Sequence, residues 1–410
     1  MAFGGGVGGP ETHLWRHRSG ESKGSPGPGG RGAFGRGTSV RVLHTADWHL
    51  GKLFHGIHLT EDQARLLEEE FFPLVRDLRP DLVVIAGDIF DRPVPPGEAV
   101  ALLGEVLARL AETGATLLVI PGNHDSPERL SFARELLARV RVFVVADERY
   151  LRRPLLLLGG PPLYVAPHLS PFRLREFLAS FGEGDLPESP RGLWERLLSR
   201  LSPGGIFVGH LFVEGGQAGE SEARLWVGGE EAVPARAFEK LDLVLLGHLH
   251  RPQRPAENIY YAGSLLPLSF SEAEDQKGVW FFEMDERGRP GHREFLPLCP
   301  PRPFRVLRGR FEELLSGPRE EAYLKIVLED SGPIPQAFER LKERYPYLLA
   351  LEFAPENSSS GPLRPPPSPE SLSEEELFGK FLQEVAGRPP SEEERTAFRE
   401  VLKRLGPAFL

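Results

Sequence analysis

The sequence predicts an α/β fold built as a sandwich of two sheets, and three observations support this. First, between about residues 40 and 250, short apolar runs of strand length alternate with longer stretches of helical periodicity. Second, the apolar runs are continuous, which is typical of strands buried on both faces. Third, the helical pattern fades after residue 246, and the remaining runs have the character of antiparallel strands. A simple doubly wound sheet would not show this change.

The elements are expected in a regular order. Early strands and helices alternate, with strands at 42–45, 82–86 and 116–120 and helices at 61–78 and 98–111. The first helix has an apolar face made of Leu66, Leu67, Phe71, Leu74 and Leu78. Two later buried strands are expected at 206–208 and 243–246. After them we expect a run of antiparallel strands at 258–262, 278–282 and 293–296.

The bulk composition is that of an ordinary globular protein with more than one domain. The 410 residues are too many for one compact core. No apolar run approaches the roughly 20 residues of a membrane-spanning helix, and the N-terminal stretch lacks the apolar core of a secretory signal. Cys299 is the only cysteine, which excludes an internal disulfide and a cysteine-based zinc site. We expect a cytoplasmic protein that does not bind membranes.

The net charge of −10 argues against a protein that holds nucleic acid by bulk electrostatics alone. It does not exclude DNA, because bound divalent metals add positive charge that this count omits.

Changes in composition divide the chain into five parts. Residues 1–38 are rich in Gly, Ser, Pro and Arg without hydrophobic period, and we expect them to be disordered. The main domain is expected at 39–300, where a Pro-rich joint ends it. A small α+β domain is expected at 301–353, with strands at 304–307, 322–327 and 348–353 and a helix at 335–344.

The last two parts are a linker and a pair of helices. Residues 354–372 form a Ser/Pro/Gly linker without periodicity. Two amphipathic helices are expected at 373–385 and 391–405 within the segment 373–410, and a capping box of Ser391 and Glu394 begins the second. Two short helices beyond a linker cannot bury much surface alone, so we expect them to dock on a partner.

Each of five expected strands is followed by side chains that suit a metal ion. Because ligands bind beyond the carboxyl ends of the strands in α/β sheets, these loops should converge. Together they offer seven candidate ligands: Asp47, His49, Asp88, Asn123, His210, His248 and His250. Carboxylate, imidazole and amide oxygen suit divalent manganese, iron or zinc. Seven ligands are too many for one ion and about right for two ions that share a carboxylate.

Each motif also has a simpler interpretation. Asp-x-His and Gly-Asp occur as ordinary polar loops and turns. Gly-Asn-His-Asp is also compatible with an Asx-turn, with Asp125 or Ser126 capping the next helix. The presence of all five motifs, in order and each at a strand end, favours the metal site. Trp48 is expected to be exposed by its place in the first loop, where it would stack on a base or pack against the small domain.

The ordered motifs resemble those of the calcineurin-like metallophosphoesterase superfamily. The segments LHTADWHLG at 43–51 and GNHDSP at 122–127 are similar to its SbcD branch, the bacterial nuclease subunit that works with the SbcC ATPase in DNA double-strand-break processing. This resemblance covers about residues 40–300 and implies a four-layer α/β sandwich of two mixed sheets. It also implies that the small domain is a capping domain and that the C-terminal helices dock on the SbcC coiled coil.

The resemblance further implies roles for individual residues. One metal would be held by Asp47, His49, Asp88 and His250, and Asp88 would bridge to a second metal completed by Asn123, His210 and His248. His124 would stabilise or protonate the leaving oxygen, and Asp91 would orient His124 through its carboxylate. Manganese is the metal that the resemblance implies.

The implied activity is a two-metal DNA nuclease. The family combines a 3′ to 5′ exonuclease with an endonuclease that cuts hairpins and blocked ends, as a homodimer within a heterotetramer that also contains SbcC. Two alternatives remain open at this point. A phosphatase acting on a small molecule or phosphoprotein would use the same ions but would not require the extra domain and helices. A non-catalytic scaffold would have no need of seven ligands and His124.

Overall fold

The structure is a computed structural model. It describes residues 39–157, 160–182, 184–219, 222, 231–285, 289–332, 334–354, 378, 390–392, 394, 395 and 398. The expected disordered tail at 1–38, the linker at 354–372 beyond its first residue, and most of the two C-terminal helices lie outside these residues. The chain divides into two compact units, Met1–Ala354 and Pro355–Leu410.

The first sheet of the larger unit has six strands. Their order across the sheet is β13 (Pro290–Pro297), β12 (Gly278–Met284), β1 (Val40–Thr45), β4 (Leu82–Ala86), β5 (Thr116–Ile120) and β6 (Val142–Val144). β1, β4, β5 and β6 are parallel, with Val42 opposite Leu82 in the register of β1 and β4. β12 and β13 run antiparallel at the other edge. The sheet is therefore mixed. β1, β4 and β5 match expected strands, whereas β6 was not expected.

The second sheet has five strands, in the order β10 (Gln253–Ala256), β11 (Ile259–Tyr261), β9 (Leu243–Gly247), β8 (Ile206–His210) and β7 (Leu163–Ala166). The expected run of antiparallel strands at 258–262, 278–282 and 293–296 is wrong in part. β11 pairs parallel with β9 and belongs to this sheet, whereas β12 and β13 belong to the first. The reason is β10, which reverses the chain before β11. As an edge strand with the sequence QRPA, β10 lacks an apolar run that would reveal it.

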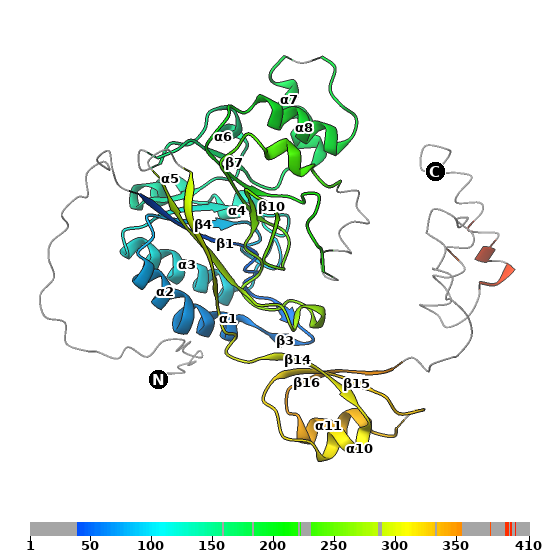
Figure 1. Ribbon diagram of the computed structural model, residues 1–410. Coiled ribbons are helices and arrows are strands. Elements are labelled where there is room, and N and C mark those ends of the chain that lie inside the picture. The colour runs from blue at the N-terminus through cyan, green and yellow to red at the C-terminus, as the bar shows by residue number, and fades with distance from the viewer. Residues whose placement is uncertain are drawn as a thin grey trace, which may run out of the picture. The chain divides into compact units, whose positions relative to one another are not determined.

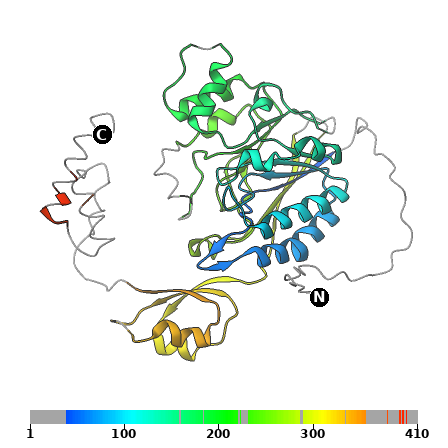
Figure 2. The ribbon, with the colours of Figure 1, turned by 180° about the vertical axis from the view of Figure 1, so that it is seen from behind.

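Helices cover the outer face of the six-stranded sheet. α1 (Thr60–Leu66), a π-helical turn η1 (Leu67–Phe71) and α2 (Phe72–Leu78) form the continuous helix expected from the sequence, and α3 (Gly97–Glu112) lies beside it (Figure 2). α3 buries residues spaced three or four apart, which gives it one apolar face. That face packs on strand residues of the first sheet such as Val83 and Leu117.

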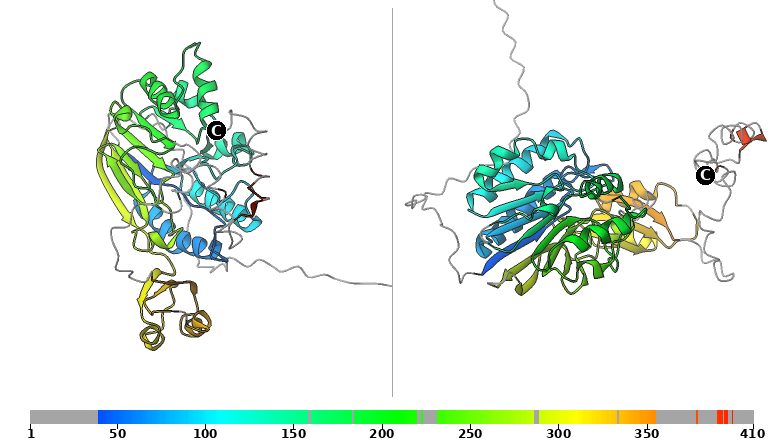
Figure 3. Two further views of the ribbon diagram at one scale, coloured as in Figure 1. Left: turned by 90° about the vertical axis from the view of Figure 1, so that its right-hand side faces the viewer. Right: turned by 90° about the horizontal axis from the view of Figure 1, so that it is seen from above.

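The two sheets pack on each other through a separate core. Val84 and Leu118 of the first sheet face Val165, Val208 and Leu245 of the second. The outer face of the second sheet is covered by α7 (Pro171–Ala179), α8 (Pro190–Arg200) and the 3-10 turn η4 (Ala235–Phe238). The order helix, sheet, sheet, helix is visible in Figure 3 and confirms the four-layer sandwich.

Several short elements complete the main domain. They are β2 (Leu53–Phe54), β3 (Ile57–His58), α4 (Pro127–Leu130), α5 (Arg134–Leu137), η2 (Ala138–Val140), α6 (Arg149–Arg152) and η5 (Phe270–Glu272). None of the helices in the described part of the chain is long and apolar enough to cross a membrane.

The small α+β region follows the Pro-rich joint (Figure 1). Its three strands are parallel, in the order β14 (Phe304–Gly309), β15 (Tyr323–Leu328) and β16 (Leu348–Phe353). The expected helix is α11 (Ala337–Arg344), and a second, α10 (Phe311–Ser316), is too short to predict from periodicity. Its own core includes Leu341, and Phe304 of this region packs against Phe54 of the main domain with ring centroids 5.3 Å apart.

In the smaller unit, the described residues include the predicted capping box. The Ser391 backbone N–H donates to Glu394 Oε2 at 2.7 Å, and the Glu394 N–H donates to Ser391 Oγ at 3.2 Å. The rings of Phe378 and Phe398, one from each expected helix, stack with centroids 4.2 Å apart.

Candidate metal centre

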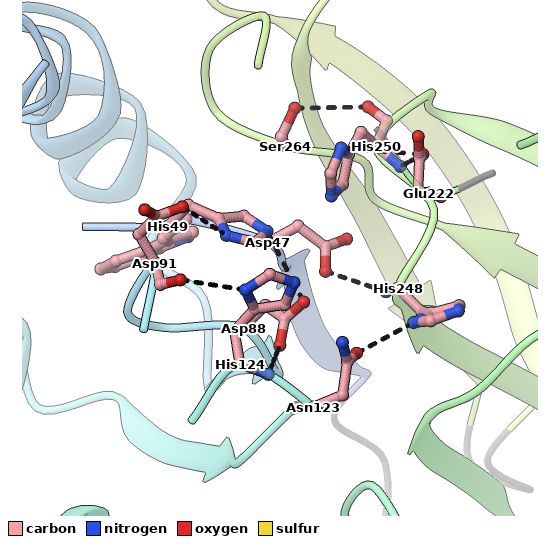
Figure 4. Close-up of polar contacts among 12 residues, drawn as sticks. Asp47, His49, Asp88, Asp91, Asn123, His124, Glu222, His248, His250 and Ser264 are labelled. Carbon is pink, nitrogen blue, oxygen red and sulfur yellow. Dashed lines mark hydrogen bonds and ion pairs between the residues drawn. The ribbon is translucent and has the colours of Figure 1, made fainter. Parts of the chain in front are cut away.

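The strand-end loops of both sheets converge on one site, which Figure 4 shows in close-up. β1, β4 and β5 contribute the loops that begin with Asp47, Asp88 and Asn123, and β8 and β9 contribute the histidines of the second sheet. Ligand atoms of Asp47, Asp88 and His210 all lie within 4.8 Å of one another. The five loops thus meet at one edge of the sandwich, as parallel strands require.

The backbone at the site is strained and closely packed. Asp47, His49, Asp88 and His248 have positive φ angles of 51°, 45°, 49° and 100°. Non-glycine residues in this region store strain, which is frequent at functional sites. A Cβ atom at Gly122 would overlap the Asp88 carboxylate and backbone nitrogen, so only glycine fits here.

The Asp88 carboxylate lies at the centre of the site. Its Oδ2 atom is 3.5 Å from His49 Nε2 on one side and 3.4 Å from His210 Nε2 on the other. Its Oδ1 atom accepts a hydrogen bond from the His124 backbone N–H at 2.9 Å. Burial opposes ionisation of this carboxyl, but the neighbouring His210 outweighs it and holds the pKa of Asp88 below its usual range. The carboxylate is thus placed to be shared by two cations.

One group of candidate ligands lies around Asn123. Its Oδ1 atom is 3.0 Å from His210 Nε2 and 3.1 Å from His248 Nδ1. His210 Nδ1 lies 2.9 Å from the Ala86 carbonyl oxygen and can donate to it, which leaves Nε2 for a ligand bond. Burial lowers the pKa of His210, but the adjacent Asp88 carboxylate outweighs burial and raises the pKa to about 10.

The remaining candidate ligands are Asp47, His49 and His250, of which Asp47 also lies 3.8 Å from His210 Nδ1 through its Oδ1 atom. The rings of His49 and His250 are 5.0 Å apart, and Asp47 Oδ1 accepts from the His248 backbone N–H at 2.8 Å. Asp47 Oδ2 is buried and has no hydrogen-bond partner among the residues that the structure describes. Burial raises the pKa of Asp47 to about 7 and lowers the pKa of His49 to about 4. A buried acceptor without a partner is costly, and a cation would satisfy it.

His124 and Asp91 lie together, but not as expected. His124 Nδ1 is 2.9 Å from the main-chain carbonyl oxygen of Asp91. The Asp91 carboxylate instead lies 3.5 Å from His49 Nδ1 and accepts from Lys52 Nζ at 2.9 Å. These two contacts outweigh burial and lower the pKa of Asp91 to about 2. The orienting partner of His124 is therefore a carbonyl group, and the carboxylate faces a candidate metal ligand.

Sequence reasoning missed the carboxylates behind His250. Its Nδ1 atom lies 3.7 Å from Glu222 Oε1 and 3.5 Å from Glu272 Oε1. Lys277 Nζ donates to Glu272 Oε2 at 2.7 Å and to Ser264 Oγ at 3.0 Å. Burial raises the pKa of Glu272, but His250 and Lys277 outweigh burial and hold the pKa below its usual range. Carboxylates at this distance orient a metal-binding imidazole. Neither Glu222 nor Glu272 belongs to a strand-end motif, so the sequence pattern gives no sign of their role.

Asp125 was also missed as part of the site. Its carboxylate accepts from the backbone N–H groups of Gly122, Ile89 and Phe90 at 2.9, 3.0 and 2.9 Å. It thereby ties the loop after β5 to the loop after β4. Helix α4 is capped by Ser126 instead, whose Oγ accepts from the Arg129 N–H at 3.3 Å.

Trp48 is not the exposed platform expected from its loop. The side chain is 1% exposed and packs edge-on against Phe71 with ring centroids 5.9 Å apart. Its Nε1–H donates to Thr45 Oγ1 at 2.8 Å. Trp48 cannot stack on a base, because the loop turns it into the core beneath α1.

Comparisons with known proteins find two matching family models and a nuclease relative. Residues 40–252 match the family model for calcineurin-like phosphoesterases, and residues 300–386 match that for the type 5 capsule protein repressor C-terminal domain. The D chain of the nuclease SbcCD from Staphylococcus saprophyticus is 34% identical over 324 residues, covering 76% of this chain and 84% of that protein. The crystal structure of TT1561 of Thermus thermophilus is 17% identical, covers 64% of this chain and 100% of that chain, and superposes with a TM-score of 0.34.

The fold and the family match define the protein as a calcineurin-like metallophosphoesterase, a metal-dependent phosphodiesterase. Within that class, the chain belongs to the SbcD family of nuclease subunits. The resemblance in the strand-end motifs is thereby confirmed, and divalent metal ions are the cofactors of the protein. Because the family is one of enzymes, the scaffold alternative is excluded.

Proposed function

We propose that this protein is the DNA nuclease subunit of an SbcC–SbcD-like complex, with two Mn²⁺ ions at the strand-end site. The observation that carries the proposal is the position of Asp88 Oδ2 between His49 Nε2 and His210 Nε2, at 3.5 and 3.4 Å. Family membership supports a DNA nuclease. The resemblance of the strand-end motifs implies digestion 3′ to 5′ from duplex ends and cutting at hairpins and blocked ends. The biological role is DNA double-strand-break repair, recombination and replication.

The resemblance of the strand-end motifs implies two ligand sets. Asp47, His49, Asp88 and His250 would hold one ion, and Asp88, Asn123, His210 and His248 would hold the other. The set of carboxylates, imidazoles and one amide oxygen suits divalent manganese. Two bound ions supply the positive charge that lets water attack an anionic phosphodiester near neutral pH.

The remaining chemistry falls to His124. Because Nδ1 faces the Asp91 carbonyl oxygen at 2.9 Å, the ring presents Nε2 to the substrate. In the imidazolium form, the carbonyl oxygen stabilises the Nδ1–H, and the Nε2–H donates a hydrogen bond or proton to the leaving oxygen. Asp91 contacts both histidines: its main-chain carbonyl group contacts His124, and its carboxylate contacts His49.

Partners are proposed from the rest of the chain. The helices expected at 373–385 and 391–405 dock on the SbcC coiled coil, supported by the match of residues 300–386 to the family's C-terminal domain. Residues 301–353 cap the nuclease domain over the DNA. Two copies of this chain pair as a homodimer within a heterotetramer. The sequence alone did not indicate which surface they use to pair. Phe132, Leu136 and Val140 lie close together in the sequence and are 82%, 61% and 55% exposed, and a second copy would cover such apolar side chains.

The test is digestion of linear duplex and hairpin DNA by the purified chain with Mn²⁺, Mg²⁺ or EDTA, beside His124→Ala. A small phosphomonoester is assayed in parallel, and an SbcC-type partner is added to a second set. We expect Mn²⁺-dependent cleavage of DNA that is lost in the variant. Turnover of the phosphomonoester with DNA intact under all conditions would overturn the proposal in favour of the phosphatase.

A further inference from the structure

Two adjacent residues of helix α1 contact opposite parts of the molecule. Gln63 faces the loop that follows β1, which carries the proposed metal ligand His49. Asp62 faces the small α+β region and the Pro-rich joint before it. Both side chains are buried, Gln63 at 0% and Asp62 at 6% exposure. Because a helical turn is held by its own backbone hydrogen bonds, a displacement of one residue displaces the other.

Gln63 holds the backbone of the metal loop from three directions. Its Nε2 donates to the carbonyl oxygens of Trp48 and His49, each at 2.9 Å. Its Oε1 accepts from the Gly51 N–H at 3.1 Å. His49 has a φ of 45°, a conformation that the surrounding contacts must maintain. Gln63 therefore fixes the strained backbone from which the His49 ring projects.

Asp62 connects the same helical turn to the small region. Its Oδ2 accepts a short hydrogen bond from the Tyr323 hydroxyl on β15 and another from Arg302 at 3.4 Å. Arg302 lies in the joint, donates to the Tyr323 hydroxyl at 2.8 Å, and stacks over the Tyr347 ring at 3.9 Å. A buried carboxylate with two such partners is costly to break, so this contact fixes the small region on α1.

We propose that α1 couples the packing of the small α+β region against Asp62 to metal binding. In this proposal Asp62 and Gln63 are positioning residues for the His49 loop. The link rests on the proposed role of His49 as a metal ligand. Among the described residues, Asp62 has no recorded contact with that loop. Tyr323 approaches it only through Phe54 of β2, with ring centroids 6.5 Å apart. Their loss should nevertheless weaken metal binding, because Gln63 would no longer hold the loop in one conformation.

The experiment measures Mn²⁺ affinity by isothermal titration calorimetry on the full chain. The variants are Gln63→Glu, Asp62→Asn and Tyr323→Phe. Glu61→Gln is the matched control, since it removes the same charge as Asp62→Asn from an exposed position on the same helical turn. Gln63→Glu keeps the side-chain shape but replaces both donors with oxygen, so we expect affinity about 10-fold weaker. For Asp62→Asn and Tyr323→Phe we expect Mn²⁺ affinity about 3-fold weaker than that of the wild type. For Glu61→Gln we expect Mn²⁺ affinity to change by less than about 1.5-fold.

Thermal unfolding in EDTA separates this role from a merely structural one. A structural role alone would lower the melting temperature of Asp62→Asn and Tyr323→Phe and leave their Mn²⁺ affinity equal to that of Glu61→Gln, which would overturn the inference. If Asp62→Asn fails to fold, Tyr323→Phe decides alone, because it removes a single hydroxyl. Wild-type protein that binds no Mn²⁺ would defeat the proposed function itself. If the wild type binds Mn²⁺ normally and the variants bind it equally well, only the proposed coupling through α1 is overturned.

Discussion

At the scale of single residues, His124 depends on the main chain of Asp91 and not on its carboxylate. His124 contacts the Asp91 main-chain carbonyl, which no substitution of Asp91 removes. The Asp91 carboxylate contacts His49 and Lys52 instead. The two side chains should therefore serve separable purposes, His124 in the chemical step and Asp91 in the metal site.

Asp91→Asn is expected to weaken Mn²⁺ affinity by about 10-fold, the usual effect of losing a partner of a metal ligand. At saturating Mn²⁺, its kcat should stay close to that of the wild type. His124→Ala should do the reverse, with kcat lower by about 10²- to 10⁴-fold and metal affinity nearly unchanged. Calorimetry and steady-state digestion give both quantities. A large fall in kcat for Asp91→Asn at saturating metal would show that its carboxylate acts on His124 after all.

Metal affinity should rise with pH, because metal ligands must be deprotonated. In the metal-free protein, Asp47 has a pKa of about 7, raised by burial, and His210 has a pKa of about 10, which nearby carboxylates raise against burial. Both pKa values lie above the ordinary ones. His210 therefore keeps its proton between about pH 6 and 8, whereas Asp47 loses its proton across that range, and an incoming cation must displace whichever protons remain. We expect affinity to increase by up to about 10-fold per pH unit for each proton released. Titrations in buffers of different ionisation enthalpy count those protons, and a pH-independent affinity would contradict the assignment.

At the scale of elements, the turns after the strands decide the geometry of the site. β5 ends at Ile120, and Gly122 lets the chain pass directly against Asp88. Gly122→Ala would force its Cβ into the Asp88 carboxylate, the one proposed to serve both ions. We expect loss of the second ion, from two bound per chain to one or none, together with lower thermal stability. Metal analysis after gel filtration checks this, with Gly104→Ala on α3, where a Cβ meets open space, as the control.

The elements also show why part of the fold was predictable. Strands β4, β5, β8 and β9 are buried on both faces and therefore appear as largely apolar runs, and the buried half of β1 adds Val42 and Leu43. Their ends carry the ligand motifs, so the candidate site followed from the same pattern. β10 has no apolar run because it lies at an edge, and the direction of β11 depends on it. Glu222 and Glu272 approach His250 only through tertiary packing, which strand-end motifs do not encode.

At the scale of the whole molecule, catalysis and partner binding should be separable by truncation. Ending the chain at residue 372 removes the docking helices and leaves the unit Met1–Ala354 intact. We expect the truncated protein to retain Mn²⁺-dependent digestion of DNA and to lose binding to an SbcC-type coiled coil. Co-purification with that partner measures the loss. Full retention of binding would place the docking surface elsewhere, and loss of digestion would show that the helices contribute to the nuclease itself.

The central claim is that two cations share the Asp88 carboxylate. Anomalous diffraction from crystals grown with Mn²⁺, recorded on both sides of the manganese absorption edge, tests it most directly. We predict two peaks about 3.5–4 Å apart. One should lie beside His49 and His250 and the other beside His210 and His248, with Asp88 between them. A single peak at saturating Mn²⁺, or a pair elsewhere that does not contact Asp88, would contradict the account.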